Sequence, residues 1–176
     1  TDMTPNVIFH GVPTPQMASG VDRFSRMINH CEGTKRAGGD AAYFEYVCGV
    51  LQELVDRGRT VLICGERLNF LQGLGKVFPE AVVITGETPA ADRERLFHYG
   101  QLTCITSSIG KHALSRKNLD TVVLPHPFGA SESARSSMDQ FAGRALRPLE
   151  GKDTPEFHII YPEHHVGRHY ADFAVR

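Results

Sequence analysis

The sequence predicts an α/β fold, a three-layer structure in which helices cover both faces of a parallel sheet. Several short runs of β-branched and other apolar residues are continuous rather than alternating, which is typical of strands buried on both faces. These runs alternate with helical segments across short connections, and such crossovers produce a parallel sheet. The 176 residues, 41% hydrophobic and 22% charged, suit one domain and exclude general disorder, collagen-like repeats and a coiled coil.

Residues 1–40 are expected to be a partly irregular linker that leads into the domain. Within them, residues 6–10 are compatible with a short strand, and residues 21–30 have weak helical spacing. Residues 41–165 are expected to form the domain itself, and residues 166–176 a C-terminal tail.

A regular pattern begins at Asp40, a suitable N-cap for an amphipathic helix that Gly58 ends. Beyond this helix, apolar runs predict five strands, at residues 60–64, 81–85, 102–106, 121–124 and 157–161. Three more helices are predicted at residues 67–78, at residues 88–99 with Thr88 as N-cap and Pro89 in the first turn, and at residues 131–146.

Charge and cysteine content limit the kinds of partner and compartment. The net charge of −1 gives no global attraction to nucleic acid or anionic lipid, so a site for a polyanion must be built locally. No apolar run approaches the ~18–20 residues needed to cross a bilayer, so we expect no membrane contact. The cysteines form no Cys-x-x-Cys pair, which indicates buried, reduced thiols rather than disulfides or a zinc site. They are Cys31, Cys48, Cys64 and Cys104.

Ligands of open parallel sheets collect at the carboxyl ends of the strands, so the loops there are the candidate sites. The three that combine a tight turn or hydroxyl groups with a helix start are residues 65–67, 86–89 and 107–111. Their backbone N–H groups suit an anion such as a phosphate. Ordinary strand-to-helix turn chemistry is the alternative reading of each loop taken alone.

The chain carries no phosphate loop of its own. Such a loop needs a glycine-lysine pair followed by Ser or Thr, whose hydroxyl binds magnesium. The three Gly-Lys pairs here are followed instead by Val77, His112 and Asp153. No Gly-x-Gly-x-x-Gly pattern follows a predicted strand, and no Gly-x-Ser-x-Gly marks a catalytic triad.

The densest functional pattern lies in residues 140–148. Arg144 and Arg147 are three positions apart, so a helix projects both from one face, and Gln140 lies one turn earlier on that side. Gly143 permits close packing of a neighbouring element. Two planar guanidinium groups can clamp phosphate oxygens, whereas the default reading of two helical arginines is a solvated face.

The order of strands and loops from residue 60 to residue 161 resembles the second RecA-like lobe of superfamily 2 helicases and translocases. Residues 140–147 match the family's sixth motif, and the continuation through Gly151-Lys152 is similar to the XPB-like and phage DNA-helicase branch. Residues 85–93 resemble the segment after the fourth motif, and residues 105–123 resemble the fifth motif with the strand that follows it.

The resemblance implies one half of an ATP site, in a P-loop NTPase-type fold that lacks its own P-loop. In the family, a separate N-terminal lobe of the same protein holds ATP and Mg, and the second lobe supplies arginine fingers. Carried over to this sequence, Arg144 and Arg147 would reach the γ-phosphate and Gln140 would position the site. Gly143 and Ser115 would lie against the nucleotide. The isolated chain is therefore expected to be inactive alone.

The resemblance also implies nucleic-acid binding, with DNA favoured over RNA, in the cytoplasm of a bacterial or phage-infected cell. Thr106, Gly86 and Arg93 would hold the nucleic-acid backbone through a hydroxyl, an amide and a cation, without reading base edges. Gly65 and Arg67, in the first of the anion-binding loops, are further candidate contacts.

The sequence departs from the family's fifth motif, and three other readings stay open. Ala113 replaces a usual glycine and Ser115 a frequent acid, so weaker coupling between ATP and nucleic acid is expected. The first alternative is a free-standing nucleic-acid or protein binding module that has lost the motor. The second is a Rossmann-like nucleotide-sugar enzyme with its substrate over Gly65 and Gly86. The third is a protein-interaction domain whose arginines bind an acidic partner.

The histidines offer weaker signals. His164, His165 and His169 could converge on a metal, but no carboxylate or thiol completes a known spacing, and a polar tail explains them equally well; we expect no metal. His112, beside a lysine, is a weak candidate for contact with a polyanion. His126 lies between two prolines and is expected to be a rigid turn at a strand end.

Overall fold

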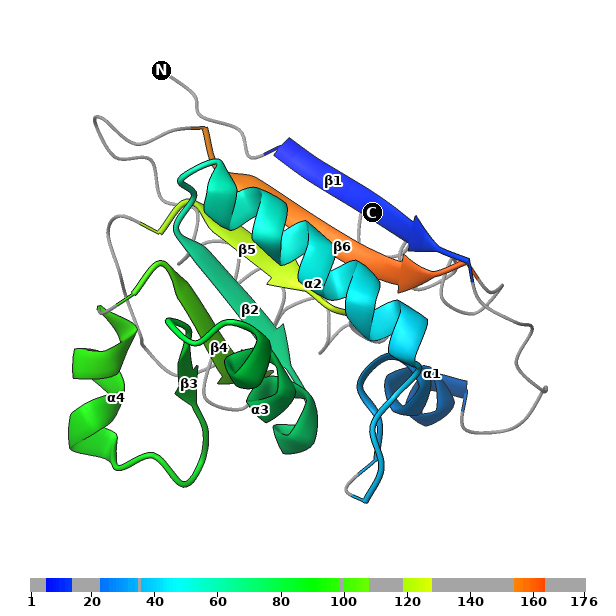
Figure 1. Ribbon diagram of the computed structural model, residues 1–176, viewed down its shortest axis with the longest axis horizontal. Helices are drawn as coiled ribbons and strands as arrows, with labels where there is room; N and C mark the ends of the chain where they lie inside the picture. Colours follow the sequence, from blue (N-terminus) through cyan, green and yellow to red (C-terminus); the bar gives the residue numbers. More distant parts are fainter. Residues whose placement is uncertain are drawn as a thin grey trace.

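Six strands form one all-parallel sheet in the order β1-β6-β5-β2-β4-β3 in a computed structural model of the chain (Figure 1). The strands are β1 (Asn6–Val12), β2 (Val61–Gly65), β3 (Val82–Ile84), β4 (Leu102–Thr106), β5 (Thr121–Leu124) and β6 (Glu156–Pro162). The helices are α1 (Arg23–Glu32), α2 (Ala41–Asp56), α3 (Leu68–Val77) and α4 (Ala90–Phe97). The structure describes residues 6–13, 23–34, 36–98, 100–107, 119–127 and 154–163.

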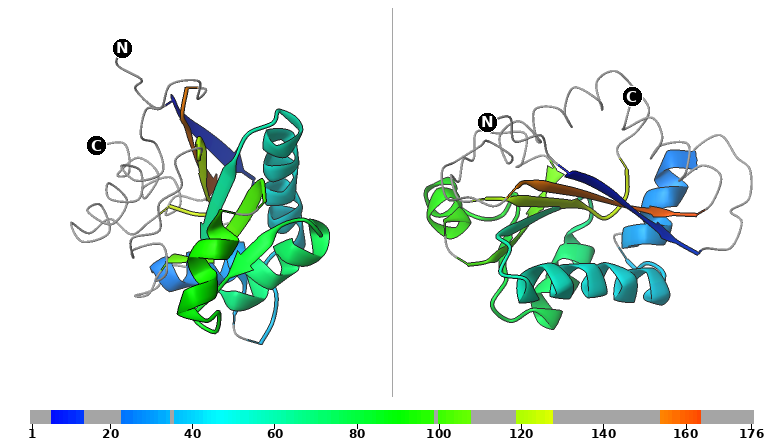
Figure 2. Two further views of the ribbon diagram at one scale, coloured as in Figure 1. Left: turned by 90° about the vertical axis from the view of Figure 1, so that its left-hand side faces the viewer. Right: turned by 90° about the horizontal axis from the view of Figure 1, so that it is seen from above.

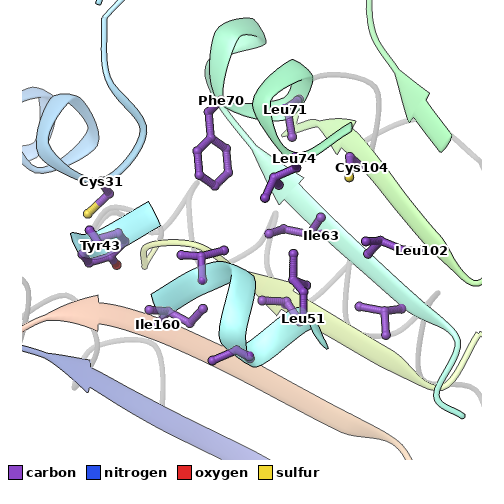
Figure 3. Close-up of a cluster of buried hydrophobic side chains, with 14 of the residues drawn as sticks. Cys31, Tyr43, Leu51, Ile63, Phe70, Leu71, Leu74, Leu102, Cys104 and Ile160 are labelled. Carbon is purple, nitrogen blue, oxygen red and sulfur yellow. The ribbon is translucent and has the colours of Figure 1, made fainter. Parts of the chain in front are cut away.

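Helices pack on both faces of the sheet, as the continuous apolar strands predict. The helices α2 and α3 lie together on one face (Figure 2), where their apolar side chains meet those of the central strands (Figure 3). The members of this cluster that Figure 3 labels include Tyr43, Leu51, Ile63, Leu71, Leu74 and Leu102. On the opposite face, Phe97 of α4 packs against Leu62 and Ile84. Every residue of β2 and of β5 is buried, which accounts for their uninterrupted apolar sequences.

Local signals in the sequence locate most of these elements. Asp40 caps α2 by accepting a 2.9 Å hydrogen bond from the Tyr43 amide, and Gly58 follows the helix with a φ of 78°, so both predicted boundaries are confirmed. The start of α4 differs from the prediction. Pro89 is its N-cap, and the Thr88 hydroxyl instead accepts a hydrogen bond from the Thr85 amide, which closes the turn before the helix. The predicted helix at residues 131–146 lies outside the described residues.

The segment expected to be a linker contributes two elements to the domain. All seven residues of β1 pair with β6, from Asn6 opposite Glu156 to Val12 opposite Pro162. The helix α1 packs against α2 and buries Met27 and Cys31 in the main apolar cluster. Pairing with β1 gives β6 hydrogen-bonded neighbours on both sides, so these residues take part in the sheet.

A polar network secures the amino-terminal edge of the sheet. Buried Arg59, just before β2, donates to the Thr121 hydroxyl and to the Thr154 carbonyl, and lies 3.4 Å from the Asp120 carboxylate. Glu156 accepts two hydrogen bonds from Arg57, at 2.7 and 3.1 Å.

The same carboxylate is linked to two histidines. Burial raises the pKa of Glu156, but hydrogen bonds from Arg57 and His158 outweigh it and hold that pKa at about 2. His158 in turn lies 2.8 Å from His10 of β1, ring nitrogen to ring nitrogen, so the network extends to the edge strand.

Replacing Arg59 with Ala should lower the free energy of unfolding by about 3–5 kcal/mol, because it leaves the Asp120 carboxylate buried without its cation, whereas Glu156 keeps Arg57. The control is Arg95→Ala, which breaks a pair with Asp92 whose side chains are 63% and 42% exposed and should cost less than about 1 kcal/mol. Urea denaturation of both variants measures the difference. Equal losses would show that the buried network contributes no more than a surface pair.

Candidate functional site at the carboxyl edge of the sheet

Three of the predicted nucleic-acid contacts lie along one edge of the sheet. Gly65 ends β2 and Thr106 ends β4, and the two are direct partners in the register of these strands. Gly86 lies two residues after the end of β3, and β3 pairs with β4 on the side opposite to β2. The structure therefore brings together three residues that are up to 41 positions apart in the sequence, at the edge where parallel sheets bind their ligands.

The loop between β3 and α4 is braced by Arg93. Its guanidinium donates to the Thr88 carbonyl at 2.9 Å and to the Gly86 carbonyl at 3.3 Å, while the side chain stays partly exposed. A side chain at Gly86 would meet no atom within 4 Å, so the glycine leaves an open surface rather than room for a packed neighbour. The Arg93 guanidinium and the Gly86 backbone therefore lie side by side at a partly exposed position next to the end of β3.

An internal carboxylate occupies the amino terminus of α3. Glu32, the last residue of α1, accepts hydrogen bonds from the Glu66 amide at 2.9 and 3.0 Å and from the Arg67 amide at 3.0 Å. A Cβ at Gly65 would lie 2.8 Å from the same carboxylate. The sequence predicts that this loop holds an anion; the anion found there is the chain's own. The Arg67 guanidinium donates to the side chain of Asn29, 3.1 Å away.

Glu32 is paired with a histidine that follows β5. The His126 ring nitrogen Nε2 contacts the Glu32 carboxylate, and both side chains are at least 98% buried. The other ring nitrogen, Nδ1, lies 3.1 Å from the Pro127 carbonyl oxygen. Burial would lower the pKa of His126, but the Glu32 carboxylate outweighs it and raises the pKa above the ordinary 6.5. His126, which the sequence places in a turn after β5, thus also forms a buried ion pair with Glu32.

Sequence reasoning missed this pair because its members carry no local pattern. Glu32 is the last residue of α1, and His126 is 94 residues away. The available signal was that Glu32 directly precedes a glycine-containing stretch and that His126 closely follows a predicted strand, so both could lie at the carboxyl edge.

The candidate residues for the nucleotide lie outside the described residues. They are Gln140, Gly143, Arg144, Arg147 and Ser115. The chain that contains the first four leaves the carboxyl end of β5 after Pro127 and returns to the amino end of β6 at Thr154. His112, His164, His165 and His169 are likewise outside.

Within the described residues, no group of three or more His, Cys, Asp or Glu side chains is placed to hold a metal ion. The four cysteines are free thiols; three are buried and Cys48 is partly buried. Burial raises the pKa of Cys104 to about 12, so this thiol is unreactive at neutral pH. None of the helices in the described part of the chain is long and apolar enough to span a bilayer.

Comparison with solved structures decides the fold, whereas comparisons of sequence find nothing. No protein-family model matches the chain, and no curated protein matches it. It is similar to the structure described as the C-terminal part of the Fun30 ATPase domain, with a TM-score of 0.62 and 16% identity over 77% of this chain. It is also similar to T4 UvsW, with a TM-score of 0.64 and 11% identity over 92% of this chain. The chain has a RecA-like fold.

These similarities confirm the predicted α/β class and the expected RecA-like fold. The RecA-like lobe spans 46% of the Fun30 chain and 33% of the UvsW chain. Each of those chains is therefore more than twice as long as the part that this lobe matches.

The buried pair predicts a pH-dependent stability. Protonated His126 stabilises the folded lobe, and because its pKa is raised on folding, that contribution is complete below the ordinary pKa of 6.5 and is lost as pH rises through the folded value. The stability difference between the wild type and Glu32→Gln should therefore be largest in mild acid and shrink above neutrality. Urea denaturation across this range measures it.

The control for that series is His98→Gln, since His98 is exposed at the end of α4 and contacts neither partner of the pair. Its stability should follow the wild type at every pH. A gap between the wild type and Glu32→Gln that stays constant with pH would show that His126 does not titrate against Glu32.

Proposed function

We propose that this chain is the second RecA-like lobe of an ATP-dependent superfamily 2 helicase or translocase. The observation that carries the proposal is the similarity of a complete six-stranded RecA-like sheet to the C-terminal part of an ATPase domain. The sixth-motif pattern at residues 140–147 supports the same assignment from the sequence. A lobe that has this fold and lacks a phosphate loop needs a second lobe to complete a nucleotide site.

ATP and Mg would be held mainly by that other lobe. Among the described loops of this chain, the helix start best suited to a phosphate, that of α3, already binds the Glu32 carboxylate. The contribution of this lobe would be the guanidinium groups of Arg144 and Arg147, whose planar donors fit phosphate oxygens. Gln140 would help to orient the site, and Ser115 and Gly143 would contact the nucleotide.

Charge stabilisation is the chemistry that these arginines would supply. During transfer of the γ-phosphoryl group, negative charge spreads over its oxygens, and a guanidinium placed there lowers the barrier without taking up a proton. Hydrolysis would thus require both lobes to close on the nucleotide.

Nucleic acid would bind along the carboxyl edge. Thr106 ends β4 and Gly86 follows β3, its neighbour in the sheet, while the Arg93 guanidinium reaches Gly86 from α4. The Thr106 hydroxyl, the Gly86 amide and the Arg93 guanidinium would hold phosphates of the backbone, with DNA favoured over RNA. Gly65 and Arg67 are adjacent on the same edge and remain candidate contacts, although the Arg67 amide and guanidinium already have partners within the lobe.

Replacing Arg144 or Arg147 with Ala in the full-length protein should reduce nucleic-acid-stimulated ATP hydrolysis by about 10³–10⁵-fold, because charge developing on the phosphoryl group would lose its cation. Binding of ATP should change little, since the other lobe holds most of the nucleotide. Steady-state hydrolysis and equilibrium binding of a fluorescent ATP analogue measure the two effects.

Arg95→Ala is the control, because this arginine lies on the exposed side of α4 and pairs only at the surface with Asp92. It should hydrolyse ATP at the wild-type rate. Wild-type turnover in both the Arg144 and the Arg147 variants would remove the arginine-finger role.

Thr106→Ala and Arg93→Ala should weaken DNA binding to a similar degree for every sequence, because they remove backbone contacts and no base contacts. Loss of the Arg93 charge should also reduce the slope of log K against log salt by about 0.9. Fluorescence anisotropy at several salt concentrations, with unrelated oligonucleotides, measures both.

Arg93→Lys separates the charge from the loop brace. Lysine keeps the cation but not the two directed hydrogen bonds to the Gly86 and Thr88 carbonyls. If Arg93 contacts phosphate, the lysine variant retains the wild-type salt slope. A reduced slope in Arg93→Lys would indicate that the arginine acts by shaping the loop.

A further inference from the structure

The buried Glu32–His126 pair joins three parts of the fold that meet only at the carboxyl edge. Glu32 ends α1, the amides that it binds begin α3, and His126 follows β5. The side chains of Glu32 and His126 are 0% and 2% exposed, so neither is placed for direct contact with a ligand. A hydrogen bond of 2.5 Å from the Tyr43 hydroxyl to the Pro125 carbonyl holds the same turn from α2.

The surroundings of His126 favour its imidazolium form. Nε2 faces a carboxylate oxygen and Nδ1 faces the Pro127 carbonyl oxygen, both of which only accept hydrogen bonds. A neutral imidazole has one N–H and can satisfy only one of them, whereas the imidazolium donates to both.

The ionisable groups around the pair are mostly acidic or uncharged. Glu66 from the β2–α3 loop adds a favourable negative charge to His126. Cys31 of α1 and Tyr43 of α2 face Glu32, and burial raises the pKa of both, so they are neutral near pH 7. Asp40, at the start of α2, lies near Cys31. Arg67 is the neighbouring cation, and its guanidinium is bonded to Asn29.

The two loops that the pair ties together are the ones that the proposed function connects. Residues 65–67 precede α3 on the edge assigned to nucleic acid, and His126 begins the stretch that leads to Gln140, Arg144 and Arg147. We propose that His126 is a positioning residue, which in its imidazolium form fixes the start of the arginine-finger segment against the Glu32-held loop after β2. This inference rests on the proposed function.

Coupling between nucleic acid and ATP should then depend on the protonation of His126. Once the ring is neutral, one of its two bonds is lost, and a shift of the β2–α3 loop is no longer transmitted to the turn after β5. The ratio of nucleic-acid-stimulated to basal ATP hydrolysis should therefore fall as pH rises, while general effects of pH on ATP and Mg cancel in the ratio.

The experiment measures this ratio for the full-length protein between about pH 6 and about pH 9, the range in which a histidine of raised pKa titrates. For the wild type we expect a fall of about tenfold, the size of losing one hydrogen bond to a charged group. His126→Gln, which can donate one N–H but cannot become a cation, should start low and stay flat. Its defect should appear in kcat, with the KM for ATP changed less than about twofold.

His98→Gln is the matched control and should reproduce the wild-type profile, because it removes an exposed histidine at the end of α4. A pH profile of His126→Gln that matches the wild type would overturn the inference. If His126→Gln matched the wild type while the Arg144→Ala variant was inactive, the proposed function would stand and only the role of His126 would be disproved. Full activity of both Arg144→Ala and Arg147→Ala would instead remove the proposed function itself.

A measurement on the wild type covers the case in which His126→Gln does not fold. The ring nitrogens of His126 should titrate in an NMR spectrum with a pKa above the ordinary 6.5 of histidine, and both should carry protons in mild acid. A neutral His126 ring in mild acid would overturn the inference without any variant.

Discussion

A carboxylate buried at the start of α3 organises the carboxyl edge of this lobe. Glu32 is removed from solvent, and an isolated buried charge costs several kcal/mol. Two amides, the positive end of a helix dipole and the His126 ring offset that cost. The two amides and the ring come from segments about 60 residues apart in the chain, so the Glu32 carboxylate links α1, the start of α3 and the turn after β5.

Buried charged groups are neutralised at both ends of the strands, but the two ends differ in what they leave exposed. At the amino edge, Arg59, Glu156 and their partners neutralise one another, and a chain of hydrogen bonds runs through His158 to His10 on the outer strand. The charged groups at that edge are bound to one another within the lobe. At the carboxyl edge, Gly86, Thr106 and Arg93 stay at least partly exposed, and in the function we propose they would meet the phosphates of nucleic acid.

In the function we propose, this lobe supplies one half of a nucleotide site. Its best phosphate-binding helix start is filled by its own carboxylate, so in the function we propose a nucleotide must be gripped from outside and met by arginines from this side. Coupling between nucleic acid and nucleotide then has to pass through the body of the lobe. The pair at Glu32 and His126 is a short, buried route between the loops concerned, which is why its protonation state matters to the proposal.

Sequence alone was sufficient wherever the determining contacts are local. The continuous apolar runs of β2, β4 and β5, the Asp40 cap and the Gly58 stop depend on neighbours in the chain, and from them the three-layer parallel fold and its candidate edge could be predicted. Glycine at 65 and 86 and threonine at 106 could be placed on that edge because parallel strands share a direction.

The contacts between segments that are distant in the sequence were decided only by the tertiary structure. A short strand at residues 6–10 is compatible with the sequence, but the sequence does not reveal that it pairs with β6, 148 residues away across the His10–His158 contact. The anion site after β2 could be predicted, but not that Glu32 fills it, because the identity of a buried partner 34 residues away depends on how α1 packs. Local sequence encodes propensity, whereas such pairs exist only once the sheet has brought their elements together.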